Sequence, residues 1–226
     1  MIDSHPEWFT EALSIAKEQR NIEIESNLIA YQKWGDADKP GIVLVHGSGS
    51  HSHWWDFIAP LLLEDFQISA IDLSGMGDSG HRQDYSPELY GKEILAVAED
   101  SNFFEVGNPI ICGHSMGGFM SAYAGLISDK KLGGVIMVDS PIRPPTYDYS
   151  THVRSGPIRR IKTYPSRESI LERFRLTPEQ ECKNEYLVKY IAEWSVKEAN
   201  NGYQWKFDDT IFDKLGFSHM TKNQAF

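Results

Sequence analysis

One serine in the sequence has neighbours that could make it a nucleophile. Ser115 is the centre of Gly113-His114-Ser115-Met116-Gly117, between an apolar run at 109–112 and a helix-like stretch at 116–128. Such a tight strand-to-helix turn excludes side chains at the glycine positions and pushes the serine hydroxyl out over the sheet. The helix N-terminus would stabilise developing negative charge. The pattern predicts a nucleophile elbow, and its alternative is a glycine-rich helix entry with a capping serine.

A second glycine-rich turn could supply hydrogen-bond donors to the same reaction. His46-Gly47-Ser48-Gly49 follows the apolar run 41–46. Because glycines let a backbone approach a substrate oxygen closely, the N–H groups of Ser48 and Met116 are the predicted oxyanion-hole donors, each typically contributing about 3 kcal/mol. The side chain of His46 is expected to be a hydrogen-bonded core histidine and not a catalyst.

Two further motifs resemble a dinucleotide site and a metal site, but their sequence context argues against both. Residues 75–80 match Gly-x-Gly-x-x-Gly after a predicted strand, but residues 81–87 postpone the helix that a dinucleotide site would open at once. His51 and His53 precede Trp54-Trp55 and have no acidic or cysteine set at ligand spacing. Packing around a pocket mouth is the better interpretation of the histidines. We therefore expect no cofactor and no metal.

Short apolar runs typical of parallel strands buried on both faces recur in the first 140 residues. They lie at 41–46, 66–72, 109–112 and 133–139. Predicted helices between them cover 54–63, 88–100 with Pro87 at the first helical position, and 116–128. An antiparallel pair is expected over 21–35. This alternation predicts an α/β fold with a doubly wound, mostly parallel sheet.

The alternation stops beyond Pro141, where a proline-punctuated stretch begins. Thr177-Pro178-Glu179-Gln180 has the form of a capping box before a helix with one apolar face, and an extended piece follows at 203–207. We interpret 1–140 as the core, 141–215 as a helical lid and 216–226 as the start of a return to the core. The lid aromatics would either line an apolar substrate pocket or attach the lid to the core: Phe174, Tyr190, Trp194, Tyr203 and Trp205.

The order of the motifs resembles the serine-nucleophile branch of the α/β-hydrolase superfamily. His-Gly follows one strand, Asp72-x-x-Gly-x-Gly-x-Ser79 the next, and Gly-His-Ser-Met-Gly-Gly the third. The resemblance is to lid-bearing bacterial esterase-like members and, at the elbow, to monoacylglycerol lipases, and it covers residues 21 to about 141 well. It implies an α/β-hydrolase fold and cleavage of a carboxylic ester or a related acyl or carbonyl substrate through an acyl-enzyme on Ser115. A serine at 115 argues against the dehalogenase and epoxide hydrolase relatives, which place an aspartate there.

The groups that would activate Ser115 stay unassigned. The resemblance implies the chain order serine, acid, histidine. Asp139 could be the acid or could cap the following turn, and His152 and His219 lie in polar contexts. We expect the last strands, with the acid and the histidine, to be missing from these 226 residues. The strand at 133–138 would then be an uncovered sheet edge that could self-associate. A ligand-binding, non-catalytic member of the superfamily is the alternative function.

Length and composition bound the remaining possibilities. A chain of 226 residues suits one α/β core with an insertion. The formal charge of −10 and the lack of a basic cluster argue against a nucleic-acid partner, and no apolar run approaches the roughly 20 residues of a membrane span. Residues 1–20 lack a signal-peptide pattern, so a cytoplasmic location is expected. The expected partner is a small, apolar, ester-like substrate.

Overall fold

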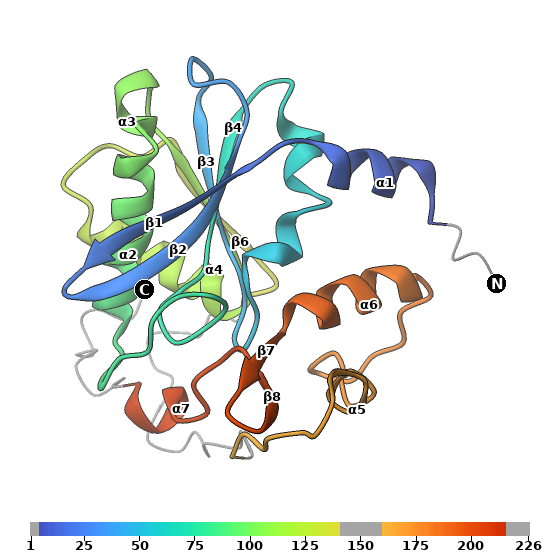
Figure 1. Cartoon of the computed structure of the whole chain (residues 1–226). Helices are drawn as coiled ribbons and strands as arrows, with labels where there is room; N and C mark the ends of the chain where they lie inside the picture. The colour runs from blue at the N-terminus through green and yellow to red at the C-terminus, as the bar shows by residue number, and fades with distance from the viewer. Residues whose placement is uncertain (1–4, 141–159, 216–226) are drawn as a thin grey trace.

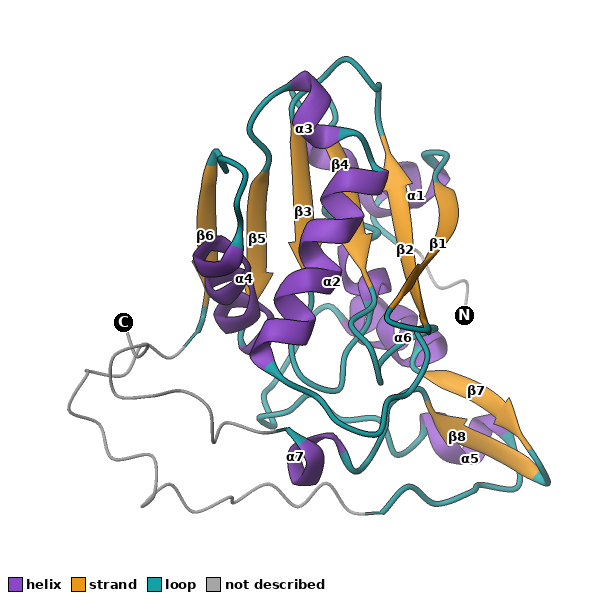
Figure 2. Cartoon of the chain, turned by 90° about the vertical axis from the view of Figure 1, so that its left-hand side faces the viewer, coloured by secondary structure: helices purple, strands orange, loops and turns teal. Residues whose placement is uncertain are grey.

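The central feature of the computed structural model, which describes residues 5–140 and 160–215, is a six-stranded sheet. Its order is β1-β2-β4-β3-β5-β6, where β4, β3, β5 and β6 run parallel and β1 and β2 are antiparallel (Figure 2). The predicted fold class is therefore confirmed. The strands are β1 (Glu18–Ile24), β2 (Asn27–Trp34), β3 (Gly41–Val45), β4 (Gln67–Ile71), β5 (Ile110–His114) and β6 (Gly134–Val138).

Helices cover both faces of this sheet (Figure 1). One face carries α2 (Pro87–Asp100), α3 (Phe103–Val106) and α4 (Met116–Ile127), and the opposite face carries α1 (Glu7–Ser14) with two short 3-10 helices. The apolar run of strand β3 is continuous because both of its faces are buried. Val43 and Val45 belong to the core cluster under α2 and α4, whereas Ile42 and Leu44 belong to the cluster on the other face.

The helix predicted over 54–63 is wrong in type. This segment forms two single-turn 3-10 helices, η1 (Ser52–Trp55) and η2 (Ala59–Leu62). Pro60 cannot donate to an α-helical ladder here. Helix α2, in contrast, begins as expected, because the Ser86 side chain accepts a hydrogen bond from the Leu89 amide at 3.1 Å and Pro87 follows.

Residues 160–215 form a group of small elements beyond the carboxyl ends of the parallel strands (Figures 1 and 2). The predicted capping box at Thr177 is wrong, because α6 begins at Glu185 after Asn184, while the capping box belongs to Ser166 and Ser169. Residues 178–183 contain no large apolar side chain that could pack a helix. The elements are α5 (Arg167–Leu171), α6 (Glu185–Trp194), β7 (Val196–Ala199), β8 (Gly202–Trp205) and α7 (Ile211–Lys214).

Backbone hydrogen bonds join this group, called the cap segment below, to the loop after β4. The amide of Gly77 donates to the Lys206 carbonyl at 2.8 Å, and the amide of Asp208 donates to the Gly75 carbonyl at 2.7 Å. The extended piece predicted near residue 205 is confirmed as β8. The division into a core at 1–140, a lid at 141–215 and a return at 216–226 stays a prediction, and 141–159 and 216–226 lie outside the described residues.

Strand β6 is the last strand of the described sheet and pairs only with β5. Its side chains Ile136 and Val138 are 49% and 44% exposed. Self-association through this edge remains a prediction. Within 5–140 and 160–215, every helix is too short or too polar to pass through a bilayer.

Candidate active site

Ser115 lies in the turn between β5 and α4, as the sequence predicts for the strand and helix on either side. Its backbone has φ 53° and ψ −121°, a region that a residue with a side chain rarely adopts. Two hydrogen bonds fix this conformation from the end of β6. The Ser115 amide donates to the Val138 carbonyl at 2.9 Å, and the Ser140 hydroxyl donates to the Ser115 carbonyl at 2.8 Å. Strained residues held in this way are concentrated at functional sites.

The glycines around Ser115 are required because backbone atoms approach them closely. A Cβ on Gly113 would come within 3.0 Å of the Gly117 carbonyl, and one on Gly117 would come within 3.0 Å of the His46 carbonyl. A Cβ on Gly118 would meet the Ser140 hydroxyl and lie 2.7 Å from the Gly113 carbonyl. The elbow is therefore packed against both the end of β3 and the end of β6.

The loop after β3 runs beside the elbow. A Cβ on Gly47 would lie 3.0 Å from Nδ1 of His114 and 3.4 Å from Cβ of Ser115. The structure thus brings the two predicted sources of oxyanion donors together. The Gly49 amide is already used, since it donates to Sδ of Met76 at 3.2 Å.

The amides of the two predicted donors, Ser48 and Met116, are not used in this way. The Ser48 amide has no acceptor among the described residues. Met116 is the first residue of α4, where helix geometry provides no intrahelical acceptor for the amide. Both N–H groups are thus available to a substrate oxygen, and their role in an oxyanion hole stays a prediction.

His46 has the structural role that its sequence context suggests. Its Nδ1–H donates to the Gly47 carbonyl at 2.7 Å, and its Nε2 accepts from the Leu73 amide at 3.1 Å. The side chain is buried, and burial lowers the pKa of the imidazole. Because both ring nitrogens are occupied, His46 holds the loops after β3 and β4 together and is not a proton acceptor for Ser115.

The glycine-rich loop after β4 is organised around a carboxylate. Asp72 Oδ1 accepts from the Ser52 amide at 2.5 Å, and Oδ2 accepts from the Asp78 amide at 2.8 Å. The amide of Gly75 donates within the loop to Gly80, and that of Gly77 donates to the cap segment. Helix α2 does not begin until Pro87. The loop therefore lacks the free amides and the immediate helix that a pyrophosphate site needs.

No group that could activate Ser115 is visible among the described residues. The Ser115 hydroxyl has no hydrogen-bond partner there. Asp139 is exposed just after β6, with φ 49°, and nothing in the structure favours it as the acid over a turn residue. His152 and His219 lie outside the described residues. The acid and the base therefore stay unassigned.

Ser195 and His51 form a hydrogen-bonded pair like that of a serine nucleophile and its base, but the surroundings of the pair do not fit catalysis. Nε2–H of His51 donates to the Ser195 hydroxyl at 2.9 Å, and that hydroxyl donates to the Ile191 carbonyl at 2.8 Å. His51 Nδ1 is buried and has no partner in the described residues, so no carboxylate orients the ring. Both residues are buried, and the pair connects η1 to the end of α6.

The neighbouring His53 belongs to a polar cluster that the sequence analysis missed. Its Nδ1–H donates to Asp56 Oδ2 at 2.6 Å, and its ring stacks on Trp194 with centroids 3.6 Å apart. The spacing His-x-x-Asp was a signal for this contact. Among residues 5–140 and 160–215, no group of three or more His, Cys, Asp or Glu side chains is arranged to hold a metal ion.

Four of the five predicted lid aromatics make side-chain contacts with the core or with one another. The Tyr190 hydroxyl donates to Asp56, Trp194 stacks on His53, and Phe174 packs on Trp205 with centroids 6.0 Å apart. These contacts fit attachment of the cap segment, and the lining of a substrate pocket stays a prediction.

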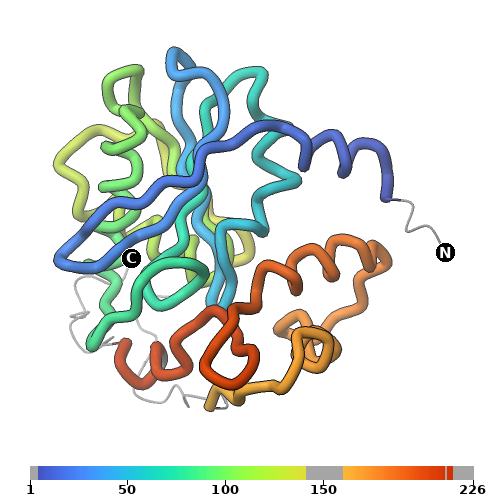
Figure 3. Tube along the Cα trace, viewed as in Figure 1, coloured from blue at the N-terminus to red at the C-terminus, as the bar shows by residue number. Residues whose placement is uncertain are grey.

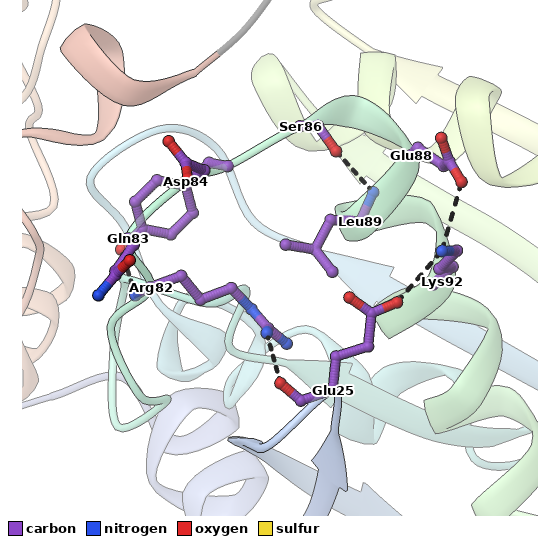
Figure 4. Close-up of a pocket in the computed structure, with 9 residues that line it drawn as sticks. Glu25, Arg82, Gln83, Asp84, Ser86, Glu88, Leu89 and Lys92 are labelled. Atoms are coloured by element: carbon purple, nitrogen blue, oxygen red, sulfur yellow. Dashed lines mark hydrogen bonds and ion pairs between the residues drawn. The ribbon is translucent and has the colours of Figure 1, made fainter.

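A surface pocket of about 410 Å³ lies away from the elbow, between the β1–β2 turn and the start of α2 (Figure 4). Its cations are already paired. Arg82 donates to Glu93 and to the backbone carbonyls of residues 24 and 25, and Lys92 contacts both Glu25 and Glu88. The pocket therefore offers no free cation to an anionic ligand and is not part of the candidate site.

Known proteins are similar to this chain in sequence. The zebrafish (Danio rerio) serine hydrolase-like protein is 25% identical over 193 residues, which cover 80% of this chain and 58% of that protein. Pimeloyl-[acyl-carrier protein] methyl ester esterase of Edwardsiella ictaluri is 32% identical over 104 residues, or 46% of this chain and 38% of the esterase. The chain thus spans less than two thirds of the length of these relatives.

The fold and the family are supported by two further comparisons. The crystal structure of a hypothetical protein from Pseudomonas aeruginosa PAO1 superposes with a TM-score of 0.68 at 20% identity, covering 92% of this chain and 78% of that one. This similarity concerns the fold alone. The profile described as "Alpha/beta hydrolase family" matches residues 42–212, which include both glycine-rich loops, the elbow and most of the cap segment. The chain belongs to the alpha/beta hydrolase family.

Proposed function

We propose that this chain carries the nucleophile of a serine hydrolase that cleaves a carboxylic ester or a related acyl substrate. Oγ of Ser115 attacks the carbonyl carbon, and the carbonyl oxygen takes the negative charge while the N–H groups of Ser48 and Met116 donate to it. The C–O bond to the alcohol then breaks, the leaving alkoxide takes the proton that the Ser115 hydroxyl gave to the general base, and an acyl-enzyme is left on Ser115. Water attacks this ester, the proton that the water loses returns through the base to Oγ of Ser115, and the carboxylic acid is released.

The observation that carries the proposal is the elbow itself. Ser115 has a strained backbone at the entrance to α4, and Gly47 of the loop after β3 lies against it. A relative whose name states methyl ester esterase supports an ester substrate. The general base and its carboxylate would come from residues outside those described here or from a longer chain.

A fluorophosphonate probe tests the nucleophile directly, because it forms a covalent bond with an activated serine. We expect labelling of the wild-type chain at Ser115, identified by peptide mass spectrometry, and none in Ser115→Ala. Ser128→Ala is the matched control, since the hydroxyl of this half-buried serine at the end of α4 hydrogen-bonds, among the described residues, only with the backbone of residue 130. Labelling that persists in Ser115→Ala would disprove the proposal.

A ligand-binding protein without catalysis is the second candidate, and it is favoured by the lack of a partner for the Ser115 hydroxyl among the described residues. The same experiment separates the two. A chain that unfolds cooperatively in urea, and is therefore folded, yet stays unlabelled would favour binding over hydrolysis. Release of nitrophenol from nitrophenyl esters of increasing acyl length would define the substrate class of an active protein.

A further inference from the structure

The helix α6 of the cap segment is covered on its outer side by the residues that precede the sheet. We call residues 5–17, which contain α1, the N-terminal strap. We propose that the N-terminal strap is a latch that holds α6 over the carboxyl edge of the sheet and thereby limits access to Ser115. The statement about access rests on the function proposed above. Figure 3 shows the strap in blue and α6 in orange on the same side of the sheet.

Aromatic contacts form the first part of the latch. Phe9 of α1 is 2% exposed, and its ring lies 5.0 Å from that of Tyr186 and 5.7 Å from that of Tyr190, centroid to centroid. It also lies 5.7 Å from Phe57, next to η2. One side chain of the strap is therefore inserted between α6 and the core.

An ion pair forms the second part. Nζ of Lys17 lies 2.6 Å from Oδ2 of Asp56, whose side chain is 2% exposed. The same carboxylate accepts the Tyr190 hydroxyl of α6 at 2.5 Å and Nδ1–H of His53 at 2.6 Å. Burial alone raises the pKa of Asp56, but the hydrogen bond and charge of His53 and the charge of Lys17 lower it below its usual value. Asp56 thus stays ionised and joins the strap, α6 and η1.

The inner side of α6 is attached to the segment that leaves the predicted oxyanion loop. Nε2–H of His51 contacts the Ser195 hydroxyl at 2.9 Å and the Ile191 carbonyl at 3.3 Å, and His53 stacks on Trp194. Residues 51 and 53 follow directly on the loop 46–49. The position of α6 therefore depends on two attachments, one to the strap and one beside the candidate site.

The strap has little stability of its own. Helix α1 has eight residues and no side-chain hydrogen bond at its N-cap. Isolated helices shorter than about 12–15 residues are marginal in water. Its outer residues Trp8 and Ile15 are 42% and 44% exposed. Because the buried face of α1 packs on α6 and the segment around Phe57, loosening one of the partners loosens the other.

Hydrogen exchange tests the latch without any assay of activity. Phe9→Ala removes the inserted ring, and Lys17→Met removes the charge but keeps most of the stem. We expect the α6 amides at 185–195 to exchange at least tenfold faster in both variants, while the α4 amides at 116–127 keep their rates. Ile15→Ala is the matched control, because it truncates an exposed apolar side chain of the strap that lies outside the aromatic cluster around Phe9, and it should change α6 exchange less than threefold.

Access to Ser115 is measured separately by comparing a bulky and a small fluorophosphonate. Release of α6 should raise the ratio of the bulky to the small labelling rate at least threefold in Phe9→Ala, whatever the intrinsic reactivity of the serine. Unchanged α6 exchange, equally accelerated exchange in α4, or an unchanged ratio in a labelled protein would overturn the latch. If the wild type is not labelled at all, the proposed function fails, and the exchange rates alone still decide whether the strap holds α6.

Discussion

Replacing Gly117 by alanine should damage the elbow through its contact with β3. A Cβ at this position would lie 2.7 Å from the Val45 carbonyl oxygen and closer still to that of His46. Ordinary contacts begin near 3.4 Å, so α4 and the end of β3 would have to separate by about 0.7 Å or more. Both obstructing atoms are backbone carbonyl oxygens, one in the last residue of buried β3 and one in the residue directly after it. Overpacking of this kind typically costs about 1–3 kcal/mol, and we take the upper value because neither side can yield.

Helix propensity opposes this loss by at most about 1 kcal/mol, the advantage of alanine over glycine inside a helix. The free energy of unfolding should therefore fall by about 2 kcal/mol in Gly117→Ala. The matched control is Gly125→Ala in the same helix, where the Cβ would meet two movable side chains, Val135 at 3.1 Å and Leu132 at 3.9 Å. This control should be unchanged or up to about 1 kcal/mol more stable.

Urea unfolding followed by circular dichroism measures both variants. Free energies of unfolding that agree within about 0.5 kcal/mol, the usual range of harmless surface changes, would show that a Cβ at residue 117 is not overpacked against β3. Fluorophosphonate labelling of Ser115 supplies a second readout. Because a displacement of about 1 Å can cost on the order of 100-fold in rate, labelling of folded Gly117→Ala should slow by about that factor, while Gly125→Ala should react like the wild type.

Two further predictions concern buried polar groups. Asp72→Asn replaces one of two accepting oxygens by an amide that faces an N–H donor, so the free energy of unfolding in urea should fall by about 2–3 kcal/mol. The control Asp78→Asn changes a half-exposed carboxylate and should cost less than about 1 kcal/mol. Equal losses in the two variants would contradict this role of Asp72. Burial, with His53, His46 and Lys206 nearby, lowers the pKa of His51 well below its ordinary value of 6.5, so its stabilising contribution is complete above pH 6.5 and is lost as the pH falls below it. His51→Gln keeps a donor for Ser195 but does not titrate. Between pH 6.5 and 5 its free energy of unfolding should fall less steeply than that of the wild type, and the two slopes should differ by up to about 1.4 kcal/mol per pH unit. Parallel slopes would exclude His51 as the titrating group.

The sequence was sufficient for the sheet and the elbow because both depend on local patterns. Continuous apolar runs such as Gly41–Val45 occur where a strand is buried on both faces, and the structure buries all five of these residues. The turn at Ser115 was recognisable because its glycines are required by contacts within a few residues and by the adjacent strands. Pro60 was the overlooked signal against a continuous helix after β3.

The parts that could not be predicted depend on residues far apart in the chain. Nothing near Asp56 in the sequence indicates that it accepts a hydrogen bond from Tyr190, 134 residues later, or that Lys17 pairs with it. The use of the Gly49 amide by Met76, which distinguishes it from the Ser48 amide, likewise depends on how two loops pack. The sequence pattern did not predict helix α1, because its buried face consists of Phe9 and Ala12 alone and is too short to give a periodic pattern.

The contact between α1 and α6 also has a consequence for biosynthesis. Tyr186 and Tyr190 leave the ribosome about 180 residues after Phe9. At a synthesis rate of about 5–20 residues per second, this interval lasts about 10–35 s. During that time the sheet strands and α4 are already available to fold, whereas α1 has no α6 to bind and exposes its aromatic face to solvent. Docking of α1 is thus a late event in the life of the nascent chain.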